Sequence, residues 1–295
     1  MQQVTVRVPA STSNLGPGFD CLGVALRIYN DVTVTRGAKS RPQTVVDEAA
    51  DLFFHHARRA SFSFSVSIAG NVPPSRGLGS SVTLRLGVLH ALNALAGGRV
   101  DPLSLFQLCA QLEGHADNAA PAVFGGFTVV RGQTVQRFDV SELLSFVLLI
   151  PDFEIKTSGA RRILPSRITR VAAVENCANA CAITAAFASG NYRNLRSAFA
   201  DYLHQPYREK LIPFLPRVIA YAEKAGALGA FLSGSGSTIC AITLQDRNKV
   251  AAAMKRCAGS TSTRTIITRA DNCGARLIKS SMPNQVITIS NGSSS

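Results

Sequence analysis

Residues 72–81 read Val72-Pro73-Pro74-Ser75-Arg76-Gly77-Leu78-Gly79-Ser80-Ser81. The two glycines let the backbone come close to a ligand, and apolar residues then recur at mostly three- and four-residue spacing as far as Leu95, which predicts a helix. Because a helix N-terminus offers free N–H groups and a positive dipole end to an anion, the segment predicts a phosphate-binding loop. A turn that only caps a core helix is the alternative, and the Gly-Lys-Ser/Thr of the common P-loop is missing.

Length and composition favour a folded protein of two domains. With 295 residues, 46% of them apolar, the chain can bury a sizeable core. Seven cysteines without a disulfide-like framework favour a reducing compartment, and Cys177 and Cys181 lack the second ligand pair of a zinc site. The N-terminus alternates like a strand and shows no signal-peptide core. We therefore expect a cytoplasmic protein in which no apolar run reaches membrane-spanning length.

The chain is strongly basic, with a net charge of +13. Such a charge suits nucleic acid or any other anionic ligand. The arginines are spread along the chain, however, and no basic segment is interleaved with aromatic residues, so a specific nucleic-acid surface is not favoured. A positive field would equally attract a nucleotide.

The N-terminal segment predicts a strand and then an unusual loop. Val4, Val6 and Val8 alternate with polar residues, and Pro9 is expected to end the strand. The loop that follows is rich in Gly, Pro, Ser and Asn, and it holds one amide, Asn14, and one carboxylate. These side chains could cap turns, but together with the later motifs they favour a substrate site. The carboxylate is Asp20, and the next strand is expected over residues 31–35.

A second polar cluster follows a predicted helix. The helix begins at Asp101 and Pro102, which supply an N-cap and an N1 proline. It ends in the segment Glu113-Gly114-His115-Ala116-Asp117-Asn118, in which polar side chains are dense between apolar flanks. A solvated helix end, with His115 bonded inside its loop, is the plain alternative. Before this cluster we expect a helix over residues 44–59 and a strand over residues 62–68.

The second half predicts alternating helices and short strands. Strands are expected over residues 127–131 and 146–151, and a basic segment from Lys156 to Pro165 then marks the domain boundary. We predict domains over residues 1–152 and 153–280 and a tail over residues 281–295. The predicted helices cover residues 168–189, 191–203 and 214–225, and a second Gly-Ser turn lies at Ser233-Gly234-Ser235-Gly236.

Taken together, these loops resemble the three motifs of the GHMP small-molecule kinases, and in particular the homoserine kinase subfamily. The first motif, with its Asn-Leu-Gly-Pro-Gly-Phe-Asp-Cys-Leu-Gly core, is the most specific, and the resemblance spans roughly residues 4 to 243. The segments that carry it are Pro9 to Leu22, Glu-Gly-His-x-Asp-Asn at 113–118, Thr157-x-x-Ala-Arg-x-Ile-Leu-Pro, Gln205-Pro206-Tyr207-Arg208 and the Ser-Gly-Ser-Gly turn.

The resemblance implies a fold and a reaction. The fold is a two-domain α+β GHMP kinase fold, with an N-terminal domain like the second domain of ribosomal protein S5 and a ferredoxin-like C-terminal domain. The reaction is transfer of the γ-phosphoryl group of ATP to the side-chain hydroxyl of L-homoserine, a step toward threonine. The family also implies Mg²⁺ as cofactor and a possible homodimer.

The resemblance assigns roles to particular residues. Ser81 and Glu113 would bind Mg²⁺, and Asp117, Asn118 and Arg161 would serve catalysis. The amino acid would be surrounded by Asn14, Asp20, Asn118, Arg161 and Arg208. The nucleotide would be held by Pro74, Ser75, Arg76, Gly77, Leu78, Gly79, Ser80 and Ser81, with the third-motif loop at Ser233, Gly234, Ser235 and Gly236.

These assignments agree with the chemistry of the expected substrate. A zwitterion with one hydroxyl needs an acid for its ammonium group, guanidinium for its carboxylate and a polar group to aim the hydroxyl. Asp20, the two arginines and Asn118 supply one of each kind. No histidine or carboxylate is an obvious general base, and Asp117 is the nearest candidate, so alignment of the hydroxyl is expected to dominate.

Two other functions are consistent with parts of the sequence. A GHMP kinase of another small alcohol would keep the phosphate loop, but it would have no ammonium group to pair with Asp20. A non-catalytic relative could use the basic surface to hold an anionic ligand or nucleic acid. Retention of both Ser81 and Glu113 argues against that function.

Overall fold

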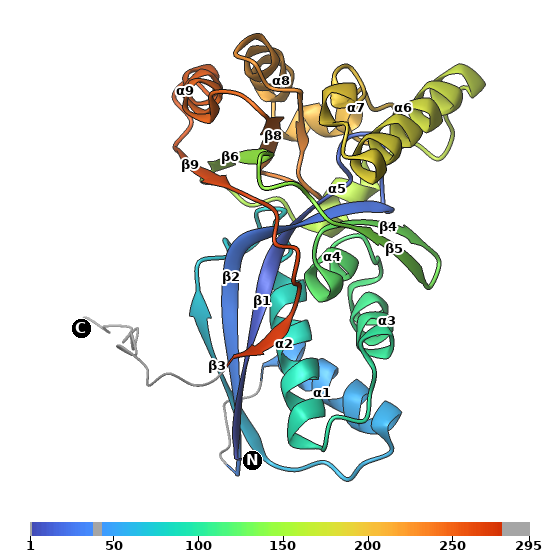
Figure 1. The fold of residues 1–295 in the computed structure, drawn as a ribbon, viewed down its shortest axis with the longest axis vertical. Helices are drawn as coiled ribbons and strands as arrows, with labels where there is room; N and C mark the ends of the chain where they lie inside the picture. Colours follow the sequence, from blue (N-terminus) through green and yellow to red (C-terminus); the bar gives the residue numbers. More distant parts are fainter. Residues whose placement is uncertain (1, 38–42, 279–295) are drawn as a thin grey trace.

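The computed structural model describes residues 2–37 and 43–278, which form a mixed α+β molecule with one sheet in each half (Figure 1). Both sheets are antiparallel. The first has the order β10-β1-β2-β4-β5, with β3 also pairing with β2, and the second has the order β7-β8-β6-β9. The first-sheet strands are β1 (Gln3–Ser13), β2 (Leu22–Arg36), β3 (Phe64–Gly70), β4 (Phe127–Arg131), β5 (Thr134–Phe138) and β10 (Arg276–Ile278).

Four helices cover the first sheet, and the remaining elements build the second half. Those on the first sheet are α1 (Thr44–Ala57), α2 (Ser80–Leu95), α3 (Pro102–Glu113) and α4 (Ala119–Phe124). The second sheet contains β6 (Ser145–Pro151), β7 (Gly229–Leu232), β8 (Ile239–Thr243) and β9 (Thr263–Thr268). Its helices are α5 (Thr157–Arg162), α6 (Arg170–Ser189), η1 (Tyr192–Leu195), α7 (Gln205–Arg208), η2 (Glu209–Leu211), α8 (Leu215–Lys224) and α9 (Arg247–Cys257).

The long β1–β2 hairpin differs from the prediction. We expected Pro9 to end the first strand, but β1 continues to Ser13 with a register shift between Pro9 and Ala10. A bulge is one of the few places in a sheet where proline is tolerated. The second strand begins at Leu22 instead of residue 31. The connecting loop therefore shrinks to residues 14–21, which leaves Asn14 and Asp20 at one end of the hairpin.

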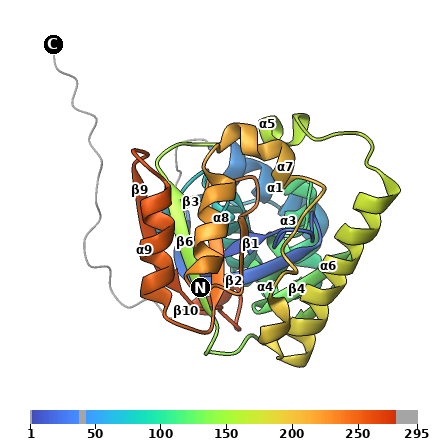
Figure 2. The ribbon, with the colours of Figure 1, turned by 90° about the horizontal axis from the view of Figure 1, so that it is seen from above.

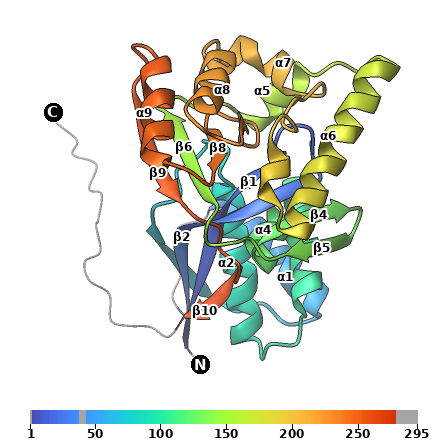
Figure 3. The same ribbon diagram turned by 45° about the horizontal axis from the view of Figure 1, so that its top comes forward.

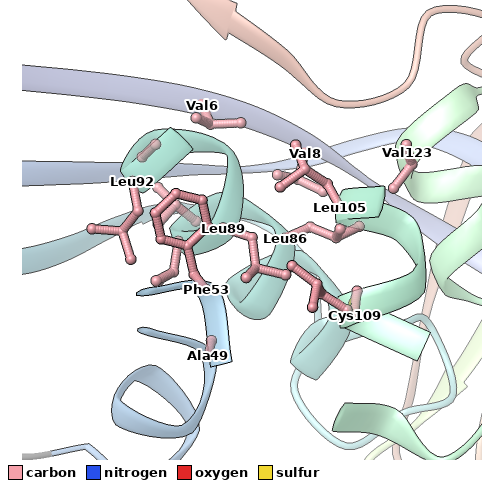
Figure 4. Packing of buried hydrophobic residues seen from close by; sticks show 14 of the residues in the cluster. Val6, Val8, Ala49, Phe53, Leu86, Leu89, Leu92, Leu105, Cys109 and Val123 are labelled. Atoms are coloured by element: carbon pink, nitrogen blue, oxygen red, sulfur yellow. The ribbon is translucent and has the colours of Figure 1, made fainter. Parts of the chain in front are cut away.

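The core of the first half forms between the sheet and α2 (Figure 4). Leu86, Leu89 and Leu92 of α2 pack with Val6 of β1 and Phe53 of α1, and all five are fully buried. The predicted apolar spacing of this helix is thus confirmed. At about 1.5–3 kcal/mol for each buried side chain, this packing fixes where α2 begins relative to the sheet.

The second sheet is buried on both faces. On one face of β6, Val147 and Leu149 belong to a buried cluster with Val218 of α8 and Met254 of α9. The opposite face of β6 belongs to a cluster that also contains Phe127 of the first sheet. The cluster includes α6, and Figure 2 shows α6 at the edge opposite α9. The two halves therefore share one apolar core.

Sheet membership divides the chain unevenly. The chain enters the second sheet at Ser145 and returns to the first at Arg276, where β10 pairs with β1. The division at residue 152 stays a prediction. The predicted tail lies outside the described residues.

Two segments of the second half also differ from expectation. The predicted helix over residues 191–203 is only η1, because Ser197 adopts a positive φ of 64° and Asp201 accepts hydrogen bonds from the backbone of the following turn. No run of membrane-spanning length was expected, yet α6 is long and apolar enough by length and composition. One such helix is weak support for a membrane span.

Candidate active site

A cavity of about 350 Å³ lies where the phosphate loop, the β1–β2 loop, the α3–α4 turn and α5 meet. Figure 3 shows α2 and α4 of the first half below α5 of the second half. The cavity collects residues that are far apart in the sequence: Asn14 and Gly234, which are 220 positions apart, both line it and are hydrogen-bonded to each other. The predicted site residues that line it are Asn14, Asp20, Pro74, Ser75, Arg76, Gly77, Gly79, Ser80, Ser81, Glu113, Asp117, Asn118, Arg161, Arg208, Gly234 and Ser235.

The phosphate loop ends at the N-terminus of α2, as its composition predicts. Gly79 is the N-cap with φ 69°, and no side chain caps the helix, so the first-turn N–H groups face the cavity end of α2. A Cβ on Gly79 would lie 2.5 Å from Ser11 Oγ. Ser80 and Ser81 line the cavity. Leu78, by contrast, is fully buried in the core and does not line it.

Arg76 reaches from the phosphate loop to the end of β6, and its Nη1 also donates to the carbonyl oxygens of Pro74 and Ser75 in its own loop. Its Nε donates to the carbonyl oxygen of Pro151 at 3.1 Å, and its Nη atoms lie 3.3–3.4 Å from the carboxylates of Asp152 and Glu154. Pro151 is the last residue of β6 in the second sheet, and the two carboxylates follow it. Arg76 therefore ties the phosphate loop to the second half, and its charge is shared with two carboxylates.

The third-motif loop supports the phosphate loop from behind. Ser233 Oγ donates to the carbonyl oxygen of Gly77 at 2.6 Å, and a Cβ on Gly77 would lie 2.2 Å from the carbonyl oxygen of Ser233. Ser233 is fully buried. Gly234 and Ser235 line the cavity, and Gly236 packs next to Ile212. The loop thus fixes the backbone of Gly77 rather than presenting Ser233 to a ligand.

Two oxygen-bearing side chains near the helix N-terminus could hold a metal ion. Ser81 Oγ donates to Glu113 Oε2 at 2.9 Å, and both residues line the cavity. Within the part of the chain that the structure describes, no group of three or more His, Cys, Asp or Glu residues could form a metal site. Two hard oxygen ligands fit Mg²⁺, which usually takes one or two carboxylates and completes its shell with phosphates and water.

Asp20 and Arg161, which both line the cavity, form a bidentate ion pair. The two N–O distances are 2.6 and 2.8 Å, and both side chains are about one-third exposed. The hydrogen bond to Asp20 raises the pKa of Arg161. The acid and the base that were predicted to bind opposite ends of a zwitterion thus neutralise each other in the free protein.

Arg208 is only 2% exposed yet lines the same cavity. Its Nε donates to the carbonyl oxygen of Ala160, and its Nη1 donates to that of Gly234. Burial and the nearby positive charge of Arg161 lower the pKa of Arg208 to about 10. No residue in the described ranges accepts a hydrogen bond from its Nη2. The cavity therefore contains a buried cation with donor capacity left for an anion.

His204 supports Arg208, a role that no sequence motif indicates. It is fully buried, with Nε2 2.9 Å from the carbonyl oxygen of Gly16 and Nδ1 3.2 Å from Arg208 Nη1. Since a carbonyl can only accept, Nε2 carries the proton and Nδ1 accepts from the guanidinium. Burial lowers the pKa of His204 and favours this neutral form. Phe19 stacks on His204 with ring centroids 5.2 Å apart.

The two predicted amides are already engaged in hydrogen bonds. Asn14 accepts from the backbone N–H of Asp20 at 3.1 Å and donates to the carbonyl oxygen of Gly234 at 3.0 Å. Asn118 accepts from Ser11 Oγ and donates to Ser13 Oγ, both at 2.9 Å. Both amides therefore hold their loops in place as well as lining the cavity.

His115 and Asp117 form a pair at the cavity wall. The distance from His115 Nδ1 to Asp117 Oδ1 is 3.0 Å, and Asp117 also accepts from the backbone N–H of Asn118. The hydrogen bond to Asp117 raises the pKa of His115. His115 thus lies in the site, although a solvated helix end was the plain alternative. Further lining residues that were not assigned roles are Ser13, Phe19, Lys156 and Thr157.

Comparison with known proteins identifies the family of this chain. The profiles of the GHMP kinases N terminal domain and of the GHMP kinases C terminal match residues 44–126 and 183–260. Homoserine kinase of Caldicellulosiruptor bescii is 39% identical over 264 residues, which is 83% of this chain and 85% of that protein. The crystal structure of homoserine kinase from Cytophaga hutchinsonii has a TM-score of 0.86 at 25% identity and covers 94% of this chain and 98% of that one.

A solved structure with a different name shares the fold alone. Mevalonate kinase of Methanococcus jannaschii has a TM-score of 0.68 at 15% identity, with 92% of this chain and 99% of that one covered. The chain therefore belongs to the GHMP kinases, and the predicted two-domain α+β fold is confirmed. Membership of this class implies the use of ATP. Within the class, the chain belongs to the homoserine kinases.

Proposed function

We propose that this protein transfers the γ-phosphoryl group of ATP to the side-chain hydroxyl of L-homoserine and so forms O-phospho-L-homoserine for threonine biosynthesis. One observation supports this reaction most strongly. A single cavity is lined both by an uncapped helix N-terminus with two serines and by Asp20, Arg161 and the buried Arg208. These are the groups that a nucleotide and a zwitterionic amino acid need.

The amino-acid end would exchange an internal ion pair for a bound zwitterion. The ammonium group of the substrate would take the place of Arg161 at Asp20, and the carboxylate would accept from Arg208. Arg161, released from Asp20, would then be free to neutralise the carboxylate or the developing charge on the phosphoryl group. Because a partly exposed pair contributes at most about 1 kcal/mol, breaking it costs little compared with two charge-assisted hydrogen bonds.

At the nucleotide end, the first-turn N–H groups of α2 would bind the phosphates, and Gly77 and Gly79 would let the backbone approach them. Ser81 and Glu113 would hold Mg²⁺, which supplies neutralisation of phosphate charge when bound. Arg76 is held by Asp152 and Glu154, so its proposed part in nucleotide binding is to fix the loop.

The acceptor hydroxyl would be aligned by Asn118, with Asp117 as the nearest candidate base. The serine partners of Asn118 fix the plane of its amide. We expect Asn118→Ala to lower kcat about a hundredfold, the effect of a misplaced reacting group, with little change in KM for ATP. Ser13→Ala is the control, since it removes one partner and leaves the amide. Full kcat in Asn118→Ala would contradict this role.

The direct test of the reaction is a coupled ADP-release assay with Mg-ATP. L-homoserine would be compared with L-serine, L-threonine, mevalonate and galactose. We expect turnover with homoserine at least a hundredfold above the other alcohols. Preferred turnover of mevalonate or galactose would overturn the roles given to Asp20, Arg161 and Arg208 but leave the phosphate site, whereas absence of turnover with all five would favour a binding protein.

We also propose a cytoplasmic location and a homodimer. Seven cysteines, none of which forms a disulfide within the described residues, are compatible with a reducing compartment. The outer face of α6 exposes Val171 and Val174, whose relative exposures are 73% and 61%, and a second copy could cover it. Light scattering coupled to size-exclusion chromatography measures the oligomeric state, and a mass near that of one chain would contradict the dimer.

A further inference from the structure

Arg85 lies behind the proposed metal site. It stands one helical turn after Ser81 on α2, so both side chains project from the same face of the helix toward Glu113. Arg85 Nη1 lies 2.6 Å from Glu113 Oε1, while Ser81 Oγ lies 2.9 Å from Glu113 Oε2. Each oxygen of the Glu113 carboxylate therefore has its own partner.

A second carboxylate fixes the other side of Arg85. Arg85 Nη2 lies 2.9 Å from Glu48 Oε2 on α1. The side chains of Arg85 and Glu113 are only 13% and 7% exposed, whereas that of Glu48 is 48% exposed. The guanidinium thus joins α1, α2 and α3 at one point, and contact with two separate carboxylates uses the planar fork that arginine has and lysine lacks.

Arg85 cannot serve as a direct ligand-binding group in this arrangement. Ser81 and Glu113 line the cavity, but Arg85 and Glu48 do not. Any effect of Arg85 on a bound ion must therefore act through the Glu113 carboxylate or through its charge. The three ionised side chains, two carboxylates and one guanidinium, sum to −1, so Arg85 halves the negative charge next to the metal site.

We propose that Arg85 is a positioning residue that leaves Glu113 a single metal-facing oxygen and thereby favours Mg²⁺ over Ca²⁺. This inference rests on the proposed function, because it uses the metal site assigned to Ser81 and Glu113. Mg²⁺ requires near-ideal octahedral geometry and uses few protein ligands, whereas Ca²⁺ accepts six to eight oxygens and often a bidentate carboxylate. Holding one carboxylate oxygen removes the second ligand that Ca²⁺ could use.

Removing the guanidinium would affect the two ions differently. For Ca²⁺, the loss of a nearby positive charge and the release of Oε1 both strengthen binding. For Mg²⁺, the same loss of charge is offset by a less firmly oriented carboxylate. Partners of metal ligands typically change metal affinity by roughly 10- to 100-fold, so we expect the Mg²⁺ to Ca²⁺ affinity ratio to fall about tenfold in Arg85→Met.

The test measures metal binding without turnover. Mn²⁺ bound to the nucleotide-free protein is followed by electron paramagnetic resonance, and Mg²⁺ or Ca²⁺ is added to displace it. Arg85→Lys keeps the charge but not the two-sided contact, so we expect a ratio between those of the wild type and Arg85→Met. Glu48→Gln removes the outer partner and should shift the ratio in the same direction by a smaller amount. Arg7→Met is the matched control, since it removes an arginine paired with Asp31 outside the cavity.

Three outcomes would overturn the proposal. The ratio could stay within twofold of wild type in Arg85→Met, or both affinities could rise equally, which would be an effect of charge alone. The change in the affinity ratio could also persist in the double variant Arg85→Met with Glu113→Gln, which would show that the change arises at another site. If circular dichroism shows that Arg85→Met does not fold, the affinity ratios of Arg85→Lys and Glu48→Gln test the proposal by the same criteria. Failure of the proposed function would look different, because the wild type itself would then show no homoserine-dependent ADP release.

Discussion

The Asp20–Arg161 pair shows how the proposed binding site for a zwitterion can satisfy its charges before the substrate arrives. Asp20 accepts both hydrogen bonds of the Arg161 fork, although the two residues are 141 positions apart. Neither is left as an isolated charge at the mouth of the cavity. The cost is that the substrate must displace one charged group from the other, which lowers the net gain from each contact.

Asp20→Asn should therefore weaken the binding of homoserine more than the binding of ATP. Loss of a charge-assisted contact corresponds to about 1.5–3 kcal/mol, reduced by the energy of the broken internal pair. We expect KM for homoserine to rise roughly tenfold or more and KM for ATP to change less than twofold. Steady-state kinetics with each substrate varied in turn measures both constants.

The matched control is Asp31→Asn. Asp31 forms an equally close bidentate pair with Arg7, with both distances 2.8 Å, but neither residue lines the cavity. The control should leave both KM values unchanged. An equal rise in KM for homoserine in the two variants would show that the effect of Asp20 arises from general destabilisation.

The His115–Asp117 pair predicts a pH dependence of stability. The hydrogen bond to Asp117 raises the pKa of His115 above its ordinary value of 6.5, so the folded state binds the proton more tightly than the unfolded state does. This stabilisation is fully present below pH 6.5 and is lost as the pH rises through the higher pKa of the folded state. Urea unfolding of the wild type and His115→Gln should show a difference in unfolding free energy that shrinks between pH 6 and pH 8.5. A difference that grows over this range would contradict the assigned sign.

At the scale of elements, α2 joins the core to the phosphate site. Its buried leucines fix the helix against β1, and Gly79 sets the direction in which its first N–H groups point. Gly79 needs both its positive φ and its missing side chain, because a Cβ would lie 2.5 Å from Ser11 Oγ. Ser11 in turn holds the amide of Asn118. A change at Gly79 would therefore disturb both ends of the cavity.

Comparing Gly79→Ala with Gly98→Ala separates the effect of the close approach to Ser11 from the effect of backbone strain. Gly98 has nearly the same conformation, with φ +68° against +69°, but nothing lies within 4 Å of the position that a Cβ would take there. Alanine at either site costs about 1–2 kcal/mol for the left-handed conformation. We expect both variants to lose similar stability to strain, and only Gly79→Ala to lose kcat/KM for ATP, by more than about tenfold. Equal loss of kcat/KM in Gly98→Ala would assign the effect to stability.

Local rules predicted the elements whose causes lie within a few residues. Asp101 caps α3 through the backbone N–H of Ser104 at 3.0 Å, as its position before Pro102 indicates. The same rules were wrong at Pro9, because the sheet around it accommodates a bulge. They also missed the return of β10 to β1, which depends on pairing between residues more than 260 positions apart.

The candidate site likewise has features that local sequence predicts and features that depend on tertiary packing. Many of the residues that line it stand in recognisable loops, so the resemblance could name these in advance, although it missed Phe19 and Lys156 and included Leu78, which is buried in the core. The hydrogen-bond and ion-pair partners of these residues could not be predicted from the sequence. That Arg161 meets Asp20, that His204 orients Arg208 and that Arg76 reaches the end of β6 all depend on how two sheets pack together. Polar partners across such a junction are fixed by tertiary packing and leave no local pattern.

At the scale of the whole molecule, the two halves share one apolar core and one cavity. Phe127 of β4 stacks on Phe187 of α6 with ring centroids 4.2 Å apart, and Arg76 ties the phosphate loop to the segment after β6. The nucleotide end and the amino-acid end are therefore held at a fixed separation by packing. In-line transfer between two bound substrates requires such a separation.

The net charge of +13 gives a final prediction that distinguishes the two substrates. A positive field attracts an anionic nucleotide and lowers the free energy of its encounter, but it exerts no net force on a zwitterion. The Debye length falls from about 30 Å at 0.01 M salt to about 10 Å at 0.1 M. Raising KCl from 10 to 300 mM should thus lower kcat/KM for Mg-ATP severalfold and leave that for homoserine within twofold. Potassium acetate is the control for specific effects of chloride. Equal losses for both substrates would mean that salt acts on the protein itself, and no loss for ATP would mean that local pairs such as Arg76 with Asp152 and Glu154 already cancel the field at the site.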